Sequence, residues 1–393
     1  MTATTTPPQA PASLKARMQT FITDEVIPVE IDVIRNNLRV TDDMRLELQE
    51  KARAAGVFGP LSSREHGGLD LSLTELIDVM EVAGTSLLGP ISVNCSAPDD
   101  GNIHLLEHAG TPEQKERYLA PLASGTVRSS IAMTEPAPGA GSDPSMLMTS
   151  ALQTSTGWII NGDKHFTTGA DGAAFFICIA DTAHGATMFI VDADNPGVEV
   201  VERMTTLDRC VPGGHCIVRF ADCEVGDDAR LGEVGSAMVY AQARLAPSRV
   251  IFCVNWLGVA IRAHHLACRH VTKRTSFGSP IAESGFAQAM IADTEIDIAA
   301  SQGLIRRAAE VIDAQGPAAS DARHAASVAK AFVAEAVWRN LDRAVQLHGG
   351  LGVCEDHLVA RFLVEARAFR IYEGPTEVLR WSIARRALRR LPN

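Results

Sequence analysis

The spacing of hydrophobic and polar residues changes twice along the chain. From 13 to 125, apolar residues recur at every third or fourth position, as in "LSLTELIDVMEVAGTSLL", and this spacing predicts helices. From 126 to 234, short β-rich runs such as "GAAFFICIAD" and "CIVRFADCEV" alternate with Gly, Asn and Asp. From 235 to 393, long helical periodicity returns. The pattern predicts an all-α, a β and a second all-α domain, after a polar leader at 1–12 that we expect to be disordered.

Local signals refine this outline. Thr111 and Gln114 form a capping-box pattern before a helix, and Asn161-Gly162 predicts a hairpin turn. Gly316-Pro317 and Gly349-Gly350 predict breaks between the later helices. A β region set between two helical regions argues against a doubly wound βαβ fold. We therefore expect an α+β multidomain protein with a central, antiparallel, β-barrel-like domain and a C-terminal helical bundle.

Composition and charge narrow the classes of partner and compartment. The 393 residues are 46% hydrophobic, which is ample for a large core, and the formal charge of −11 is spread along the chain. Nucleic acid and anionic membranes are therefore unexpected partners, and no apolar stretch approaches the roughly 20 residues of a membrane span. Eight cysteines without a C-x-x-C pair predict reduced thiols and a cytoplasmic protein.

Several short motifs could hold a ligand, although each also has a structural explanation. "MTEPAPGAGSD" fails the dinucleotide fingerprint because Pro144 stands where the third glycine belongs, leaving a hydroxyl-bearing loop with Thr134 and Ser142 or a plain surface loop. In "NGDKHFTTGA", Phe166 and Thr168 lie two apart on a predicted strand, so they share one face that could contact a flat ring or belong to an ordinary sheet.

Three further motifs lie in the C-terminal region. Arg274 in "KRTSFGSPI" could grip a phosphate, and "VQLHGGLGV" ends a helix in glycines that permit close approach of a ligand or simply stop the helix. His264, His265, Cys268 and His270 have helical metal-ligand spacing, but no fourth-ligand cluster supports a metal site. Neither a G-x-S-x-G nor an H-E-x-x-H motif is present in the sequence.

The order and spacing of these motifs resemble the acyl-CoA dehydrogenases, over nearly the whole chain from Leu14 to Arg389. The resemblance runs through "EHGGLDLSLTE", "GTPEQKERYLAPLASG", "MTEP" with "GAGSD", "NGDKHFTT", "FADCEV", "RTSFGSPI", "QLHGGLGV" and "RIYEGPTEV". It implies an FAD-dependent oxidoreductase of fatty acid metabolism, a homotetramer or homodimer that oxidises an acyl-CoA thioester and passes electrons to an electron-transfer flavoprotein.

The resemblance also implies roles for individual residues. Met133 and Thr134 would meet the flavin edge, Phe166 would stand beside the isoalloxazine, and Thr168 would face flavin N5 and O4. Ser142 would lie near the FAD pyrophosphate and the CoA arm. The neighbouring subunit would complete the FAD site, and Arg249, Tyr372 and Gly374 would contact the substrate. The implied FAD residues of the C-terminal region are Arg274, Phe277, Gln346, Gly349, Gly350 and Thr376.

Glu373 corresponds to the family's catalytic base. It stands at a break between good helix formers in "FRIYEGPTEVLR", where an acid near a helix start is the alternative explanation. Dehydrogenation removes an α-proton while the β-hydrogen leaves as hydride to flavin N5. Burial beside an apolar acyl chain is expected to bring the pKa of such a carboxylate toward neutrality, so that it can accept the proton. In the family, the backbone N–H of this glutamate helps to polarise the thioester carbonyl.

The chain departs from the common family pattern at four places. Two extra residues separate "TEP" from "GAGSD", Ser284-Gly285 replaces an aromatic or histidine followed by Gln, Phe166 replaces Trp, and "EGPTE" replaces "EGTSQ". Two other functions therefore stay open: an oxygen-using flavoenzyme of the same fold (nitroalkane-oxidising, N-hydroxylating or desulfinating), and a non-catalytic partner subunit of an active paralogue.

Overall fold

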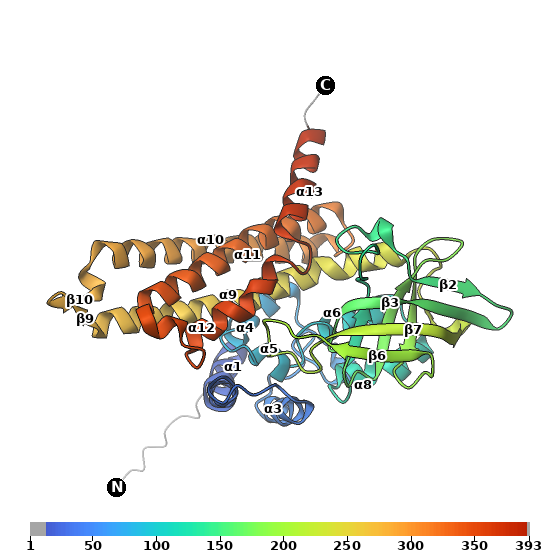
Figure 1. Cartoon of the computed structure of the whole chain (residues 1–393), viewed down its shortest axis with the longest axis horizontal. Coiled ribbons are helices and arrows are strands. Elements are labelled where there is room, and N and C mark those ends of the chain that lie inside the picture. The colour runs from blue at the N-terminus through green and yellow to red at the C-terminus, as the bar shows by residue number, and fades with distance from the viewer. Residues whose placement is uncertain (1–12, 391–393) are drawn as a thin grey trace, which may run out of the picture.

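The computed structural model describes residues 13–390, in which helices flank a β region (Figure 1). The predicted leader lies outside the described residues. The N-terminal region consists of short helices: α1 (Leu14–Phe21), η1 (Ile22–Val26), α2 (Ile27–Arg35), α3 (Asp42–Ala54), η2 (Arg64–His66), α4 (Leu73–Ala83), α5 (Gly89–Ser92), α6 (Asp99–Ala109), α7 (Pro112–Gln114), η3 (Lys115–Leu119) and α8 (Ala120–Ala123). The capping box of Thr111 and Gln114 is confirmed at the start of α7.

The central region contains β1 (Ser129–Ala132), η4 (Pro144–Met146), β2 (Ser150–Gln153), β3 (Gly157–Thr168), β4 (Phe175–Ala180), β5 (Thr187–Asp192), β6 (Val198–Arg203), β7 (His215–Gly226), η5 (Asp227–Ala229) and β8 (Arg230–Leu231). Two four-stranded sheets form, in the orders β1-β4-β5-β8 and β2-β3-β7-β6. Within them the predicted antiparallel pairing holds for every pair except β1 and β4, which are parallel. The sheets do not close into a barrel.

The prediction of a hairpin turn at Asn161-Gly162 is wrong. Both residues lie inside β3, and the register between β3 and β7 shifts at this point because β7 carries an extra residue. Asp222, with a φ of 44°, donates its backbone N–H to the Asn161 side chain over 2.7 Å. The extra residue belongs to β7, so Asn161-Gly162 stays within β3 and lies opposite the bulge instead of turning the chain.

The C-terminal region is a bundle of long helices: α9 (Ala237–Lys273), β9 (Thr275–Ser276), β10 (Ser279–Pro280), η6 (Ile281–Glu283), α10 (Gly285–Gln315), α11 (Ser320–His348), η7 (Gly349–Val353), α12 (Leu358–Ala366), η8 (Arg367–Arg370) and α13 (Thr376–Arg389). The predicted breaks fall after α10 and after α11. By length and hydropathy α9 alone among the described helices could cross a bilayer, but 61% of its apolar window is buried in the protein, as in a core helix.

The cores follow the sequence pattern. One cluster joins α1 and α4 to α9, α10 and α11, so the two helical regions share a core. A second cluster lies between the two sheets, and a third packs β4 and β5 against α6 and η3. Every residue of β4 is buried, which explains why "FFICIA" is continuously apolar rather than alternating.

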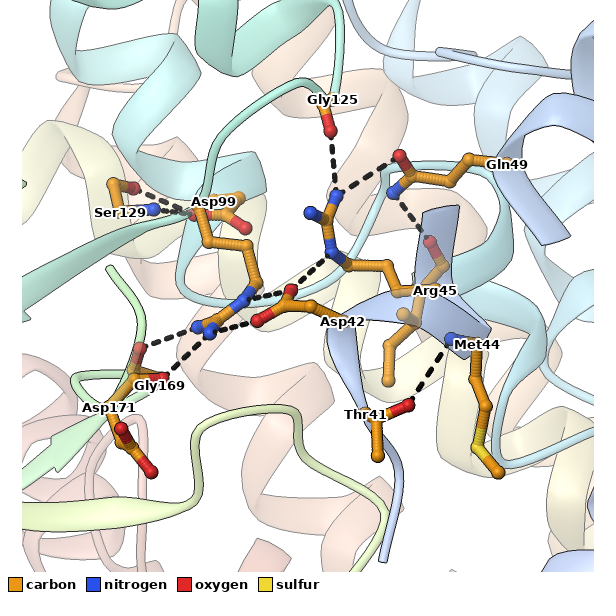
Figure 2. A network of polar contacts seen from close by, with 12 residues as sticks. Thr41, Asp42, Met44, Arg45, Gln49, Asp99, Gly125, Ser129, Gly169 and Asp171 are labelled. Carbon is orange, nitrogen blue, oxygen red and sulfur yellow. Dashed lines mark hydrogen bonds and ion pairs between the residues drawn. The ribbon is translucent and has the colours of Figure 1, made fainter. Parts of the chain in front are cut away.

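A buried polar network fastens the N-terminal helices to the β region (Figure 2). Asp42, the first residue of α3, accepts two hydrogen bonds of 2.7 Å from Arg128, which directly precedes β1. Arg128 also donates to the carbonyls of Gly169 and Asp171, just beyond β3. Arg45 binds both Asp42 and the carbonyl of Gly125. Arg128 therefore ties the segment that follows β3 to the start of α3.

Candidate functional site

The break in "FRIYEGPTEVLR" is a short loop between η8 and α13. Glu373 and Gly374 both have left-handed backbone conformations, with φ values of 56° and 94°. Glycine suits this conformation, whereas glutamate is strained in it, and such strain is often found at functional sites. The carboxylate is largely buried, and its Oε2 has no hydrogen-bond partner in the described residues.

Two buried cations fix this loop by its carbonyl groups. Arg249 Nε on α9 donates to the carbonyl oxygen of Glu373 over 2.9 Å, and Lys330 Nζ on α11 donates to that of Gly374 over 2.7 Å. Arg249 Nη1 also reaches Ser327 Oγ at 3.3 Å. Burial lowers the pKa of Arg249, and lowers the pKa of Lys330 to about 8. The strained loop is therefore anchored on both sides of the Glu373–Gly374 peptide.

The Glu373 carboxylate faces a second arginine. Arg244 Nη1 is 3.9 Å from Glu373 Oε1, and Arg244 is itself 4% exposed. Its guanidinium lies against Gly101 on α6, where an added Cβ would be 2.7 Å from Cζ. Asn102 accepts from Arg244 Nε at 3.3 Å. Only glycine at 101 leaves room for this arrangement.

Asp100 completes the charged cluster. Burial raises the pKa of Asp100 to about 6, against the opposing effect of Arg244, and its Oδ2 has no hydrogen-bond partner in the described residues. Burial likewise lowers the pKa of nearby His104 to about 4. Two carboxylates thus compete for the same arginine in a buried site. The negative charge of Glu373 adds to the rise in the pKa of Asp100.

Sequence reasoning missed Arg244, Asp100 and Lys330. A weak signal was present for two of them. Arg244 is a charged residue in an apolar helix, five residues before Arg249, and Lys330 interrupts the alanine-rich "AASVAKAFVAEAV". A charge in an otherwise apolar helix face indicates a buried partner. The partner itself could not be identified, because it comes from another part of the chain.

Met133 and Thr134 lie at the end of β1, beside β3. The backbone N–H of His165 donates to the Thr134 carbonyl over 2.8 Å, and buried Lys164 reaches the Met133 carbonyl at 3.3 Å. Lys164 also pairs with Glu135 at 2.9 Å. This edge of the β region is therefore rigid where the two predicted site residues are placed.

Glu135 organises the loop with two extra residues. Its carboxylate accepts backbone N–H groups from Ala140, Met148 and Thr149, and these hydrogen bonds lower its pKa to about 2 despite the opposing effect of burial. A Cβ at Gly139 would lie 2.4 Å from Glu135 Oε2. Ser142 lies at the exposed tip of this loop.

Phe166 and Thr168 share the less buried side of β3, while Thr167 between them is buried. The alternation is nevertheless irregular, because a bulge lies between Lys164 and Thr167 and Phe166 has a φ of 52°. The bulge leaves the Phe166 side chain 53% exposed. The Thr168 hydroxyl is 2.9 Å from Nδ1 of His215 on β7.

The remaining predicted cofactor residues gather at the far end of the helical bundle. His270 on α9 and His348 on α11 are in ring contact at 4.7 Å, so the ends of these helices meet. Arg274 and Phe277 follow α9, and Phe277 is fully exposed with a φ of 52°. This end also carries the exposed residues Gln346, Gly349 and Gly350.

These residues are remote from Glu373 within one chain. Arg274 comes 25 positions after Arg249 on a continuous helix, a separation of about 37 Å at the rise of an α-helix. Figure 1 shows the β9–β10 hairpin at the opposite end of the bundle from the β region. The chain therefore carries two separate groups of predicted site residues.

Tyr372 and Thr376 have structural partners. Tyr372 accepts a hydrogen bond from Trp256 Nε1 and packs on Phe252 at 4.9 Å between ring centroids. Burial raises the pKa of Tyr372 well above its usual value. Thr376 is buried and donates its hydroxyl to Glu335 over 2.8 Å. A contact from Thr376 to a cofactor would therefore involve its backbone.

The histidine-rich stretch of α9 does not converge on a metal-binding geometry. His264 Nε2 contacts Glu295 Oε1 at 2.8 Å, with Cys268 Sγ 3.6 Å away. No group of three or more His, Cys, Asp or Glu side chains within 13–390 is arranged to hold an ion. The His264–Glu295 contact joins α9 to α10.

Comparison with known proteins places this geometry in context. Three family models match in order: "Acyl-CoA dehydrogenase, N-terminal domain" over 10–126, the middle domain over 130–222 and the C-terminal domain over 236–388. The chain is 34% identical to "Probable acyl-CoA dehydrogenase FadE2" of Mycobacterium tuberculosis, covering 96% of this chain and 95% of the relative.

Two further similarities bear on the fold and the chemistry. The chain is 31% identical to (R)-benzylsuccinyl-CoA dehydrogenase of Thauera aromatica, over 95% of this chain and 94% of that enzyme. A solved structure assigned as an acyl-CoA dehydrogenase of Mycobacterium abscessus has a TM-score of 0.88 at 34% identity, covering 97% of this chain and 99% of that one.

Proposed function

Because the chain belongs to the acyl-CoA dehydrogenase family, and is thus an FAD-dependent oxidoreductase, we propose that it desaturates an acyl-CoA thioester to a 2,3-enoyl-CoA with Glu373 as the base. The observation that carries this proposal is the Glu373 carboxylate: a buried acid with an unpartnered Oε2, on a strained loop held by Arg249 and Lys330. A group held in this way is ready to accept a proton.

The residues of the site fit FAD. Phe166 offers an exposed aromatic ring beside the Thr168 hydroxyl, and Met133 and Thr134 are held at the adjacent edge. Gly349 and Gly350 have open space where a side chain would stand, so a ligand could approach the backbone there. When bound, FAD accepts the β-hydrogen of the substrate as a hydride. We infer that Ser142, at the exposed tip of the loop held by Glu135, contacts the pyrophosphate and the CoA arm.

Glu373 takes the α-proton on its carboxylate. Among residues 13–390 no acceptor is bonded to the Glu373 N–H, which leaves this donor free for the thioester carbonyl. Arg249 fixes the same residue through its carbonyl, so the donor and the base keep one orientation. Polarising the carbonyl makes the α-proton acidic, and preorganised donors achieve this without rearrangement during the reaction.

Assembly from two or more copies completes the site. Arg274, Phe277 and the Gln346–Gly350 segment lie too far along the bundle to serve the Glu373 of their own chain, so they contribute to the FAD site of a neighbouring subunit. Fully exposed Phe277 is an apolar group that such an interface would bury. The assembly is a homodimer or homotetramer, and electrons pass to an electron-transfer flavoprotein.

The cytoplasm is the proposed location. All eight cysteines are free thiols, six of them buried, which is compatible with a reducing compartment. Expression as a fluorescent fusion, with fractionation of the cells, tests this location. Recovery of the protein in an oxidising compartment would contradict it.

The decisive experiment is anaerobic reduction. The purified protein should carry a visible flavin spectrum that bleaches on addition of one member of a panel of acyl-CoA thioesters differing in length, branching and substituents. A colourless protein that cannot be reconstituted with FAD would refute the proposal. Rapid reoxidation by oxygen after bleaching would indicate the oxygen-using alternative, and inactivity of the pure homo-oligomer would indicate a partner subunit.

A further inference from the structure

A chain of three side chains leads from Thr168 into the protein. The Thr168 hydroxyl is 2.9 Å from His215 Nδ1, and His215 Nε2 is 2.6 Å from Asp208 Oδ2. Both imidazole nitrogens are therefore engaged, one on each side of the ring. The His215 and Asp208 side chains are 16% and 12% exposed, so water competes little for these bonds.

The far end of this chain opens into a cavity. His215 and Asp208 line a hollow of about 270 Å³ whose wall includes exposed Arg39 and Thr205. Arg203 and Arg209 also line it. The three side chains thus run from the outer side of β3 to a space that water can enter.

The partners of His215 determine which atom donates in each of the two hydrogen bonds that link Thr168, His215 and Asp208. A carboxylate only accepts, so the proton on Nε2 belongs to His215 and points at Asp208; the hydrogen bond to His215 lowers the pKa of Asp208 against the opposing effect of burial. In neutral His215 the Nδ1 nitrogen is then a bare acceptor, and Thr168 must donate its hydroxyl proton to it. This leaves the oxygen lone pairs of Thr168 free on the side away from His215.

In the other protonation state the hydrogen bond between Thr168 and His215 reverses, while Nε2 still donates to Asp208. A doubly protonated His215 donates from Nδ1 to Thr168, whose hydroxyl proton then turns outward or to the Phe166 carbonyl, 3.4 Å away. The charges around the dyad are Arg203, Arg209, Arg39 and, through its 3.5 Å pair with Arg203, Asp171. The direction in which the Thr168 hydroxyl donates therefore depends on whether His215 Nδ1 carries a proton.

We propose that Thr168, His215 and Asp208 form a proton outlet for the redox centre. This inference rests on the proposed function, which places Thr168 at flavin N5. With FAD bound, oxidation of the substrate would deliver a hydrogen and two electrons beside Thr168, and when the electrons passed to the acceptor that hydrogen would be released as a proton. Thr168 receives that proton as its own hydroxyl proton moves to His215 Nδ1. The Nε2 proton moves at the same time to Asp208, and from there to water in the cavity.

The relay predicts that reduction and reoxidation respond differently to substitution. His215→Gln and Asp208→Asn keep polar side chains of similar size but cannot pass a proton along the chain. Each should slow reoxidation of the reduced holoenzyme by ferricenium about tenfold or more, within the usual range for a lost acid–base group. His184→Gln, an exposed histidine of the same region, is the matched control and should leave reoxidation unchanged.

Stopped-flow flavin absorbance separates the two half-reactions. Dithionite supplies the reduced protein, so that reoxidation can be measured even if no acyl-CoA bleaches the flavin, and failure of the proposed function is thereby distinguishable. In the wild type, reoxidation should slow in D₂O and should lose that sensitivity in His215→Gln. Free imidazole should restore part of the rate in His215→Ala.

Three results would overturn the relay: equal reoxidation rates in wild type and both variants, equal slowing of both half-reactions, or loss of FAD from both variants. The last two would assign the dyad a purely structural role. The bound-flavin spectrum and FAD content of each variant, measured before mixing, identify the structural outcome directly.

Discussion

Arg244 on α9 stands 3.9 Å from the carboxylate of Glu373, between that acid and the buried Asp100 of α6. The proposed base and the N-terminal helical region are thus coupled through one guanidinium. Gly101 makes the coupling possible by leaving room for the arginine side chain. A cation at this distance favours the ionised carboxylate, which is the form that accepts a proton.

Replacing Arg244 by Gln should therefore weaken the base at neutral pH. We expect the acidic limb of the pH profile of kcat/KM to move upward by about one unit, with a loss of up to about tenfold on the acid side of that limb. Arg269→Gln, an exposed position on the same helix, is the control, and a profile unchanged in Arg244→Gln would remove Arg244 from the mechanism.

Glu373→Gln should give a folded, yellow protein that acyl-CoA does not bleach. The amide has nearly the shape of the acid but cannot accept the α-proton, so the rate of flavin reduction should fall by about 10²-fold or more. Anaerobic absorbance measures this directly. Glu377→Gln changes an exposed glutamate on α13, four residues further along the chain, and provides the comparison. Normal bleaching of Glu373→Gln would show that another residue is the base.

The order of helical and β regions was predictable because periodicity is a local property of the sequence. The loop at Glu373 was also predictable, since Gly-Pro after an acid marks a break between helices. Arg244 and Lys330 were not, because a buried charge reveals its partner only when distant helices pack. Asn161-Gly162 was misjudged for a related reason: the pair lies within β3 opposite a bulge of β7, and only the pairing of these two strands reveals that position.

Lys330 should make stability depend on alkaline pH. Its pKa is about 8 in the folded protein against 10.5 for a free lysine, so between these values the unfolded chain holds a proton that the folded chain has released. The free energy of unfolding then rises with pH, by up to about 3 kcal/mol across the interval. Urea unfolding of wild type and Lys330→Met at pH 7, 8, 9 and 10 isolates this contribution as a difference.

The free energy of unfolding of wild type, relative to that of Lys330→Met, should increase from about pH 8 upward. Below that pH, Lys330 is protonated in both the folded and the unfolded chain, so the difference in free energy of unfolding between the two proteins should not change with pH. A difference that is constant across the whole series would mean that Lys330 keeps an ordinary affinity for its proton, despite its burial against Gly374.

Asp42→Asn should loosen the attachment of the N-terminal helices to the β region. The change removes the charge that partners Arg128, which is 5% exposed and cannot reach water easily. Because the Asp42 side chain is itself 40% exposed, water screens the pair in part, and we expect a loss of about 1 kcal/mol. Thermal unfolding measures the loss, and Asp43→Asn, the exposed neighbour on α3, should change it little. Equal effects of the two substitutions would contradict the network in Figure 2.

The separation between Arg274 and Glu373 allows a test of site sharing by complementation. Arg274→Gln should lower FAD content, and Glu373→Gln should abolish bleaching, so neither protein alone is active. In a mixed assembly one site combines both defects. The other site pairs an intact Glu373 with an intact Arg274 from the neighbouring chain. Co-refolding or co-expression of the two variants should therefore restore activity, to about a quarter of the wild-type sites for random pairing in a twofold assembly.

If each chain built its site alone, no mixture could recover, because every site would carry one of the two substitutions. Mixing either variant with itself provides the baseline, and size-exclusion chromatography confirms that the mixed assembly has formed.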